Sequence, residues 1–341
     1  MKKSLLALAV LGAFAGVASA QTNVTIYGIA DVGFVFERGG AAGSVTKLTS
    51  GVASGSRLGF RGTEDLGGGL SANFTLENGF NLDTGAISGA TTTVANPPLF
   101  GRQVFVGLKG GFGAVNMGRQ YTPHYSILVA ADPFGNGMAG KITNVMTSVV
   151  RTDNLVKYTA PAMGGFSADV AYGFGEVAGN NSASRTIGLN LKYAAGPVMV
   201  GLGFHDLNNA TNTDDAKNTL LAGTYDFRVA KAHLAYGINK GTGTVDNRDL
   251  MAGVTVPFGA SKLLASYIRK DDKSALNRDA SQWAIGYLYA LSKRTDLYAA
   301  YGNITNKNGA TFRVGNNTES ATSVPAASGD RAFNLGIRHS F

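Results

Sequence analysis

The residue types that most often carry enzyme chemistry are sparse in this chain of 341 residues. It contains no cysteine, which excludes disulfides and thiolate chemistry, and it contains four histidines. None of these histidines pairs with a second ligand and a nearby acid at the i, i+4 spacing of a zinc site. No Gly-x-Ser-x-Gly elbow, phosphate-binding loop or dinucleotide fingerprint lies in a strand–turn–helix context. We therefore expect no metal, no cofactor and no enzymatic activity, with His205-Asp206 as the one adjacent pair that could form a catalytic dyad.

Charged residues recur singly in segments where polar and apolar side chains alternate. Around Leu58 and Phe60, for example, the alternation turns Arg57 and Arg61 to the opposite face. The charges that this logic places on a polar face are Asp31, Arg57, Arg61, Arg151, Asp153 and Lys157. Charges at the narrowest point of an aqueous passage sort ions by sign, whereas charges elsewhere on its wall are simply solvated. Both interpretations stay open at this point for Arg61 and Lys157.

The alternation has period two and repeats in segments of about ten residues separated by turns. In the first segment Ile26 and Phe34 share one face, while Thr25 and Asp31 share the other. The same pattern recurs around Trp283 and runs through the last segment to the final residue. The signal is weak in any one segment, but its repetition predicts a transmembrane β-barrel.

Short and long connections follow one another along the chain. Tight turns such as 64–69, 109–113 and 195–197 alternate with eight longer polar stretches at residues 38–44, 81–98, 122–150, 176–184, 207–216, 241–245, 271–279 and 305–330. Eight long loops imply sixteen antiparallel strands, and a barrel of that size leaves room for water inside. We expect the strands to begin near residues 22, 45, 69, 99, 112, 151, 165, 185, 197, 217, 229, 246, 260, 279, 295 and 331.

A soluble β-sandwich or an exported β-helix would also show alternating strands. Two features favour the all-β membrane barrel. Aromatic residues such as Phe36, Tyr267 and Trp283 lie near segment ends on the apolar face, where an interfacial girdle belongs. The last segment also ends on an aromatic residue, Phe341, with no polar tail.

The first twenty residues have the composition of a secretory signal peptide. Two lysines are followed by an apolar run from Leu5 to Val17 and by the small-residue site Ala18-Ser19-Ala20. We expect cleavage after residue 20, which leaves residues 21–341 as one barrel domain in the bacterial outer membrane; the alternative is an N-terminal membrane anchor. The formal charge of +8 is spread along the chain, whereas a nucleic-acid site would be a basic cluster, so no nucleic-acid partner is expected.

Several stretches, in this order and spacing, resemble the general diffusion porins of Gram-negative bacteria. They are residues 24–28, 56–70, 102–108, 117–123, 153–158 and 291–295, together with the terminal Phe341. The resemblance implies a homotrimer of sixteen-stranded barrels for passive diffusion of small hydrophilic solutes, with no enzymatic activity. It also implies an inward-folded third loop and a C-terminal strand, ending at Phe341, that is read by the outer-membrane assembly machinery.

The resemblance also suggests which residues form the pore constriction. Arg57 and Arg102 match positions of the basic ladder in family porins, and the third loop, residues 122–150, should face them. Where the family has Pro-Glu-Phe-Gly-Gly, this loop reads Asp132-Pro133-Phe134-Gly135-Asn136, so one acid is missing, and it adds a base, Lys141. We expect a pore that is weakly anion-selective or nearly unselective; the alternative is a substrate-specific outer-membrane channel.

Partner contacts are expected at the outer face and in the loops. Arg119 shares a face with Val115 and Met117 and could meet a carboxylate of a neighbouring copy, with Glu77 and Asp83 as candidates; otherwise it reaches to the membrane interface. Acidic pairs in the long loops could bind cations that bridge to lipopolysaccharide, or could simply be solvated. An outer-membrane adhesin or a barrel enzyme are further alternatives, but strands account for almost the whole length.

Overall fold

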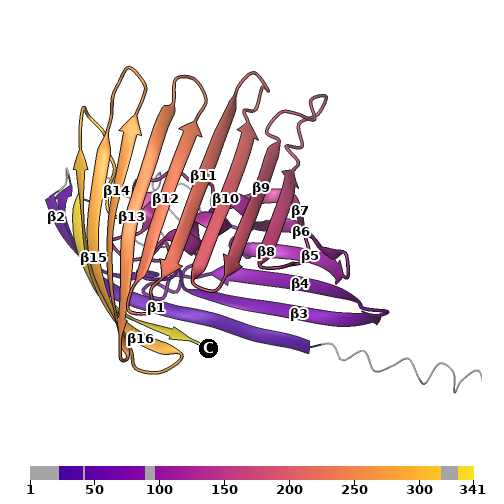
Figure 1. Ribbon diagram of the computed structural model, residues 1–341, viewed down its shortest axis with the longest axis horizontal. Coiled ribbons are helices and arrows are strands. Elements are labelled where there is room, and N and C mark those ends of the chain that lie inside the picture. The colour runs from indigo at the N-terminus through magenta and orange to yellow at the C-terminus, as the bar shows by residue number, and fades with distance from the viewer. Residues whose placement is uncertain (1–22, 41–42, 89–96, 316–328) are drawn as a thin grey trace, which may run out of the picture.

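The computed structural model describes residues 23–40, 43–88, 97–315 and 329–341, so the expected signal peptide lies outside the described residues. Strands dominate this part of the chain (Figure 1). The elements are β1 (Asn23–Gly40), β2 (Gly43–Ser50), β3 (Arg57–Gly67), β4 (Leu70–Gly79), β5 (Gln103–Gly110), β6 (Gly113–Tyr121), α2 (Pro123–Ala131), η1 (Ile142–Asn144), β7 (Arg151–Thr159), β8 (Phe166–Gly173), β9 (Thr186–Ala195), β10 (Val198–Asn208), β11 (Asp215–Asp226), β12 (Lys231–Lys240), β13 (Asp246–Phe258), β14 (Ser261–Asp272), β15 (Ala280–Ala290), β16 (Thr295–Asn306) and β17 (Arg331–Ser340).

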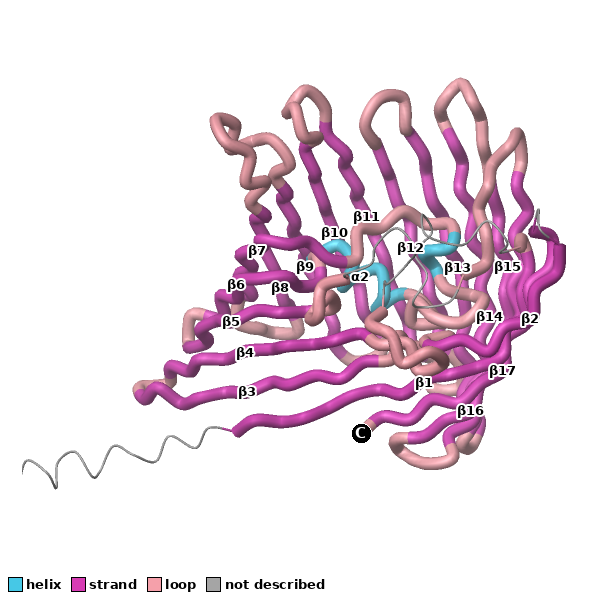
Figure 2. Tube along the Cα trace, turned by 180° about the vertical axis from the view of Figure 1, so that it is seen from behind, coloured by secondary structure: helices cyan, strands magenta, loops and turns pink. Residues whose placement is uncertain are grey.

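The strands form one antiparallel sheet that closes on itself. From β3 onward each strand pairs with its neighbours in sequence, and β17 returns to β1 through pairs that run from Ile29↔Ser340 to Arg38↔Arg331. On its other edge β1 pairs first with β3 and then with β2, so these two strands occupy one position in the wall. The result is the expected sixteen-stranded antiparallel β-barrel (Figure 2).

One expected strand is interrupted. The sequence predicts a continuous strand from about residue 45, but the chain leaves the sheet between β2 and β3. The carboxylate of Asp31 accepts hydrogen bonds from the backbone amides of Ala53 (3.3 Å) and Ser54 (3.0 Å), and Val52 is fully buried. A buried carboxylate thus takes up amides that would otherwise pair along the strand, which diverts residues 51–56 from the wall.

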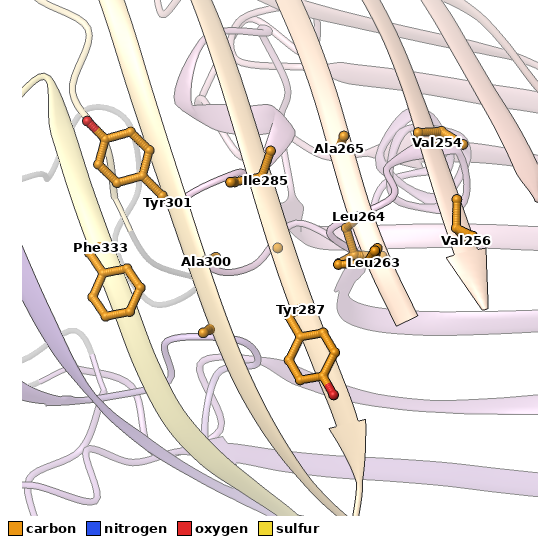
Figure 3. Close-up of a pocket in the computed structure, with 12 residues that line it drawn as sticks. Val254, Val256, Leu263, Leu264, Ala265, Ile285, Tyr287, Ala300, Tyr301 and Phe333 are labelled. Carbon is orange, nitrogen blue, oxygen red and sulfur yellow. The ribbon is translucent and has the colours of Figure 1, made fainter. Parts of the chain in front are cut away.

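The two faces of the wall differ as the alternation predicts. Apolar side chains are exposed on one face, for example Ile26 (62%) and Ile285 (56%), while Asp31 and Gln282 on the other face are fully buried. On the exposed apolar face Ile285, Tyr287, Tyr301 and Phe333 surround a shallow depression of about 390 Å³ (Figure 3). We call this face the outer face and the opposite one the inner face. Within the described residues, no helix has the length and apolar character needed to cross a bilayer.

The short turns and the C-terminus lie at the same end of the barrel. β16 starts after the turn at residues 291–294, and Ser340 donates its backbone N–H to Arg294 O (2.7 Å). The longer connections, such as 273–279 between β14 and β15, lie at the other end (Figure 1). In bacterial outer-membrane barrels the short turns are periplasmic and the long loops extracellular.

The segment between β6 and β7 contains α2 and η1 and packs on the inner face. Thr122 caps α2 by accepting a hydrogen bond from the backbone amide of Tyr125 (3.1 Å), and a proline occupies the first helical turn, where it loses no hydrogen bond. The helix contacts β9 to β12. Ile127, Leu128 and Ile142 are buried there, so the main apolar core lies between this segment and the wall.

Candidate functional site

Three arginines from three separate parts of the wall meet around one tyrosine. Arg102 Nη2 and Arg151 Nη2 donate hydrogen bonds to Tyr121 OH over 2.9 and 2.7 Å. The guanidinium of Arg151 also lies over the Tyr121 ring, 4.4 Å from its centroid. Arg57, at the start of β3, completes the group and donates from Nε to Gly55 O (2.9 Å). Each guanidinium is held in place while part of it stays available to a solute.

A single carboxylate lies within this group. Glu77 Oε1 is 2.8 Å from Arg102 Nε and 4.0 Å from Arg57 Nη1, and Glu77 Oε2 accepts a hydrogen bond from Tyr27 OH (3.0 Å). The side chain is 4% exposed. Because its two oxygens are taken by Arg102 and Tyr27, Glu77 neutralises part of the arginine charge and presents little free acceptor surface.

The segment between β6 and β7 faces the arginines across a cavity of about 460 Å³. Its lining combines the three arginines with polar and basic side chains of that segment, among them Tyr125, Ser126, Asn136, Lys141 and Thr143. Four basic side chains line the cavity and Glu77 pairs with one of them, so these five groups, all among the described residues, carry a net formal charge of +3. Chloride, carboxylates and phosphates would be attracted to this space, and cations repelled from it.

Asp132 does not face the arginines. Its carboxylate accepts hydrogen bonds from the backbone amides of Phe134 (3.0 Å), Asn136 (2.8 Å) and Ile142 (3.0 Å). Burial raises the pKa of Asp132 to about 6, although these three amides act to lower it. Asp132, which the sequence analysis placed in the constriction, therefore stabilises the fold of its own loop, because three backbone amides of that loop bind its oxygens.

Phe134 is an anchor of the same loop. The side chain is 4% exposed, and a Cβ on Gly286 of the wall would come within 2.7 Å of its ring. The glycine thus lets the ring approach the inner face closely. At Gly302 the contact is backbone to backbone, since a Cβ there would meet the carbonyl oxygen of Ala139.

Polar pairs fasten the far end of the loop. Lys270 Nζ lies 2.6 Å from Asp249 Oδ1, with both side chains almost fully buried, and it donates to Thr147 Oγ1 (3.0 Å). Asp249 Oδ2 accepts from the backbone amide of Thr147 (3.0 Å). Asn144 donates to the amide oxygen of Gln282 (2.9 Å). The loop is therefore bound to β13, β14 and β15 by hydrogen bonds as well as by apolar contacts.

Three other charges of the predicted site lie away from the arginine group. Asp31 is buried and bound to Ala53, Ser54 and Tyr298 OH, which donates over 2.9 Å. Arg61 is exposed on the inner face with its guanidinium 5.1 Å from the Tyr27 ring centroid. Lys157 is half-buried on β7 and does not line the cavity.

Arg119 lies on the outer face, as expected, but its charge is met within the same chain. Arg119 Nη1 is 2.6 Å from Asp153 Oδ1, and Nε donates to Gly101 O (2.7 Å). The prediction that Asp153 points inward is wrong. Asn154 has φ of +51°, and the pairing register shifts between Gly118 and Gln120, so the alternation of β7 breaks at this bulge.

The two candidate carboxylates for Arg119 have different positions. Glu77 belongs to the arginine group and is not at the outer face. Asp83 lies exposed in the connection after β4.

Phe341 exchanges backbone hydrogen bonds with Gly28 (3.0 and 3.1 Å), and its side chain is 47% exposed.

In the part of the chain that the structure describes, the histidines belong to no group of three or more side chains that could hold a metal ion. His205 and Asp206 are consecutive on β10, so their side chains point to opposite faces and cannot act as a dyad. Burial lowers the pKa of His124 in α2 to about 3, and the nearby His205 acts in the same direction.

Tyr121 and Glu77 are the members of the site that the sequence analysis missed. Glu77 alternates with Phe74 and Leu76, and this parity places it inward once β4 is recognised. Tyr121 ends β6 directly before the loop, and no local pattern indicates that two arginines meet there. Arg102 precedes β5, and its side chain faces the cavity.

Comparison with known proteins gives a consistent picture. Residues 7–309 match the model of the family described as Gram-negative porin. The chain is 34% identical to outer membrane porin protein 32 of Delftia acidovorans, with all of both chains covered, and 33% identical to an outer membrane porin protein of Bordetella pertussis over the same coverage. Among solved structures, the anion-selective porin from Comamonas acidovorans is 31% identical with a TM-score of 0.79, covering 94% of this chain and 100% of that one. A trimer form of OmpT from Vibrio cholerae, at 19% identity, shares the fold with a TM-score of 0.70, covering 94% of this chain and 99% of that one.

Proposed function

Because the chain belongs to the Gram-negative porin family, we propose that it forms a water-filled channel in the outer membrane through which small hydrophilic solutes and ions diffuse passively. The channel prefers anions weakly. The observation that carries this proposal is the cavity between the wall and the loop, which Arg57, Arg102, Arg151 and Lys141 line, with Glu77 as the carboxylate paired to Arg102. The similarity to a porin described as anion-selective supports the same sign of selectivity.

The segment between β6 and β7 is the inward-folded third loop of this proposal, and it narrows the channel. Its support is the packing of α2 and of Phe134 on the inner face, together with the hydrogen bonds to β13, β14 and β15. Such a loop sets the smallest cross-section of the pore, because its apolar side is fixed to one wall and its polar side faces the arginines opposite.

The proposed assembly is a homotrimer. Its contact surface includes the outer face of β4 to β7, where Phe74, Val104, Met117 and Arg119 line a groove of about 830 Å³. Asp83 lies beyond the end of β4 and is a proposed contact of the neighbouring copy. Because Asp153 already pairs with Arg119, this contact does not depend on a carboxylate from another copy. Phe341 is proposed to be read by the assembly machinery, and outer-membrane lipid, including lipopolysaccharide, surrounds the barrel.

The proposal contains no catalytic step. The relatives named above are porins, which are channels rather than enzymes. A substrate-specific channel of the same architecture would show a conductance that saturates with one solute, whereas a diffusion pore conducts in proportion to concentration.

The test is the reversal potential of the purified protein in a planar bilayer under a salt gradient. We expect a reversal potential whose sign indicates a preference for anions over cations. Replacing Arg57 with Gln removes one charge, which contributes about 0.6 kcal/mol for an ion passing at about 7 Å in water. Because the charge attracts anions and repels cations by this amount, the anion-to-cation permeability ratio should fall about sevenfold. Lys262→Gln, at the start of β14 next to a short turn, removes the same charge far from the cavity and should leave the ratio unchanged. A clear cation preference of the unmodified protein would overturn the proposal.

A further inference from the structure

The outer face carries two unpaired cations near the long-loop end of the barrel. Arg269 on β14 and Lys307 after β16 are exposed, and among the residues that the structure describes neither side chain has an ion-pair partner. Other basic residues near this rim do have acids close by. Lys217 lies 2.5 Å from Asp215, Lys273 lies 2.5 Å from Asp271, Lys240 lies 3.9 Å from Asp246, and Arg331 lies 3.3 Å from Asp330.

These two cations border one polar pocket of about 130 Å³. Tyr267, Ser281 and Thr305 contribute hydroxyl-bearing side chains to its lining. Arg269, Ser281 and Thr305 are direct neighbours across β14, β15 and β16 in the pairing register. Asp279 also lines the pocket, but its Oδ1 accepts a hydrogen bond from the backbone amide of Asp272 (3.1 Å). Guanidinium, ammonium and hydroxyl donors on one small site suit a phosphate group.

The height of this pocket matches that of lipid headgroups. Two residue pairs closer to the middle of the barrel, the outward side chains are Tyr267 and Trp283, and the Trp283 ring lies 5.3 Å from that of Tyr301. Tyrosine and tryptophan mark the boundary between hydrocarbon and headgroups. Arg269 is two residues beyond Tyr267, which is about 7 Å along the strand and on the polar side of that boundary.

An apolar depression lies below the pocket on the same strands. The small residues Ala265 and Ala299 line the 390 Å³ depression together with the larger Leu263, Ile285 and Tyr301. Figure 3 shows Ala265 among these larger side chains. Ile285 is four residues from Ser281, which is about 13 Å along β15. A polar site and an apolar depression in line across β14 to β16 suit one amphipathic molecule.

We propose that Arg269 and Lys307 bind the phosphate of an outer-leaflet glycolipid, with one of its acyl chains in the depression over Ala265 and Ala299. Arg269 contacts the phosphate oxygens through two parallel N–H donors, Lys307 supplies a point charge, and the hydroxyls of Ser281 and Thr305 donate further hydrogen bonds. The location in the outer leaflet rests on the proposed insertion of the barrel with its long loops outside the cell.

Binding can be measured on the full-length protein in nonionic detergent. The probe is purified lipopolysaccharide, used intact or after phosphatase treatment, and the readouts are the fluorescence of Trp283, the one tryptophan in the sequence, and native mass spectrometry. Removing two surface cations costs about 2 kcal/mol of attraction to an anionic lipid surface, so Arg269→Gln/Lys307→Gln should bind the intact probe about thirtyfold more weakly. Phosphatase treatment should weaken binding to the unmodified protein by a similar factor.

Lys262→Gln/Lys293→Gln is the matched control. It removes two exposed cations from the short-turn end of the same sheet and should bind the intact probe as tightly as the unmodified protein does. Ala299→Leu fills the depression and should weaken glycolipid binding, whereas Arg269→Lys should retain most of it. The proposal is overturned if the double variant binds normally, or if the dephosphorylated probe binds the unmodified protein as tightly as the intact one.

Inorganic phosphate separates the lipid from a free anion. If inorganic phosphate at equal concentration displaces the glycolipid, the site takes free phosphate and the lipid assignment is wrong; we expect no displacement. Channel conductance is measured on the same variants and should be unchanged, because these side chains lie on the outer face. If neither the variants nor the unmodified protein conducted ions, the proposed channel function would be wrong, while the proposed lipid site would stand.

Discussion

Glu77 Oε1 lies 2.8 Å from Arg102 Nε, and this ion pair is the point at which the arginine group is partly neutralised. Arg151, on the other side of Tyr121, has no carboxylate within ion-pair distance among the described residues. The positive charge facing the cavity is therefore unequally distributed, with Arg102 more strongly compensated than Arg151.

Replacing Glu77 with Gln should increase anion preference. Gln keeps the size of the side chain and can still bond to Tyr27 and Arg102, so the change is mainly the loss of one negative charge. By the same Coulomb argument, the anion-to-cation permeability ratio should rise about sevenfold. Reversal potentials in a planar bilayer measure it. Glu64→Gln, on the exposed periplasmic part of β3, is the matched control. An unchanged ratio in Glu77→Gln would show that this carboxylate does not influence permeating ions.

The ion pair between Lys270 and Asp249 should behave non-additively. Either Asp249→Asn or Lys270→Met leaves one buried charge without its partner, which costs about 3–5 kcal/mol of unfolding free energy. The double variant removes both charges and should cost less than either single change. Urea unfolding of the protein in lipid vesicles provides the values. The exposed pair Lys217–Asp215 serves as the comparison, with an expected effect below about 1 kcal/mol. If the losses of unfolding free energy in the two single variants add up to the loss in the double variant, the proposed coupling between Lys270 and Asp249 is wrong.

Phe134 should control how firmly the third loop is held. Phe134→Ala removes a buried ring beside Gly286 and leaves a cavity, at a cost of about 3–5 kcal/mol. The loop should then open more often, which raises current noise in single-channel recordings and speeds hydrogen exchange across residues 123–146. Phe112→Ala, in a turn where the side chain is 48% exposed, is the control and should leave both unchanged. Unaltered noise and exchange in Phe134→Ala would show that the loop is fixed by its other contacts.

Most of the barrel follows from local patterns in the sequence. Side-chain alternation and the turn residues between segments depend on neighbours only a few positions away, so strands such as β15 and β17 begin within two residues of their expected positions. The break between β2 and β3 depends on Asp31, some twenty residues earlier, and the inversion at Asp153 depends on a bulge around Asn154. Such features depend on contacts between residues that are distant in sequence or on local bulges, and the alternation of side chains predicts neither.

The candidate site was predictable only in part for the same reason. Arg57 could be assigned to the inner face because Leu58 and Phe60 after it alternate clearly, whereas Arg151 lies inward although the alternation of β7 breaks at Asn154. The role of Asp132 depends on three amides of its own folded loop, and that of Tyr121 on two arginines from different strands. Residue type alone suggests that Asp132 is an acid of the pore and that Tyr121 is an aromatic residue of the membrane interface. The structure shows neither role.

The third loop contains two buried titratable groups whose effects on stability have opposite signs. The pKa of Asp132 is raised to about 6, so its ionisation is disfavoured in the folded loop and stability falls as pH rises from about 4 to 6. The pKa of His124 is lowered to about 3, so its protonation is disfavoured and stability falls as pH drops from about 6.5 towards 3. Between pH 4 and 6 the two effects partly cancel in the unmodified protein.

Removing either group should reveal the other. Asp132→Asn should lose loop stability on acidification from pH 6.5 to 4, by at most about 1.4 kcal/mol per pH unit, because only the His124 effect remains. His124→Gln should show the reverse, with stability rising over the same range. Hydrogen exchange of residues 123–146, corrected for the intrinsic pH dependence of exchange, measures both. If the two variants respond to acid in the same direction, one of the two groups is not titrating as its burial requires, and the charge on Asp132 at neutral pH must be reassigned.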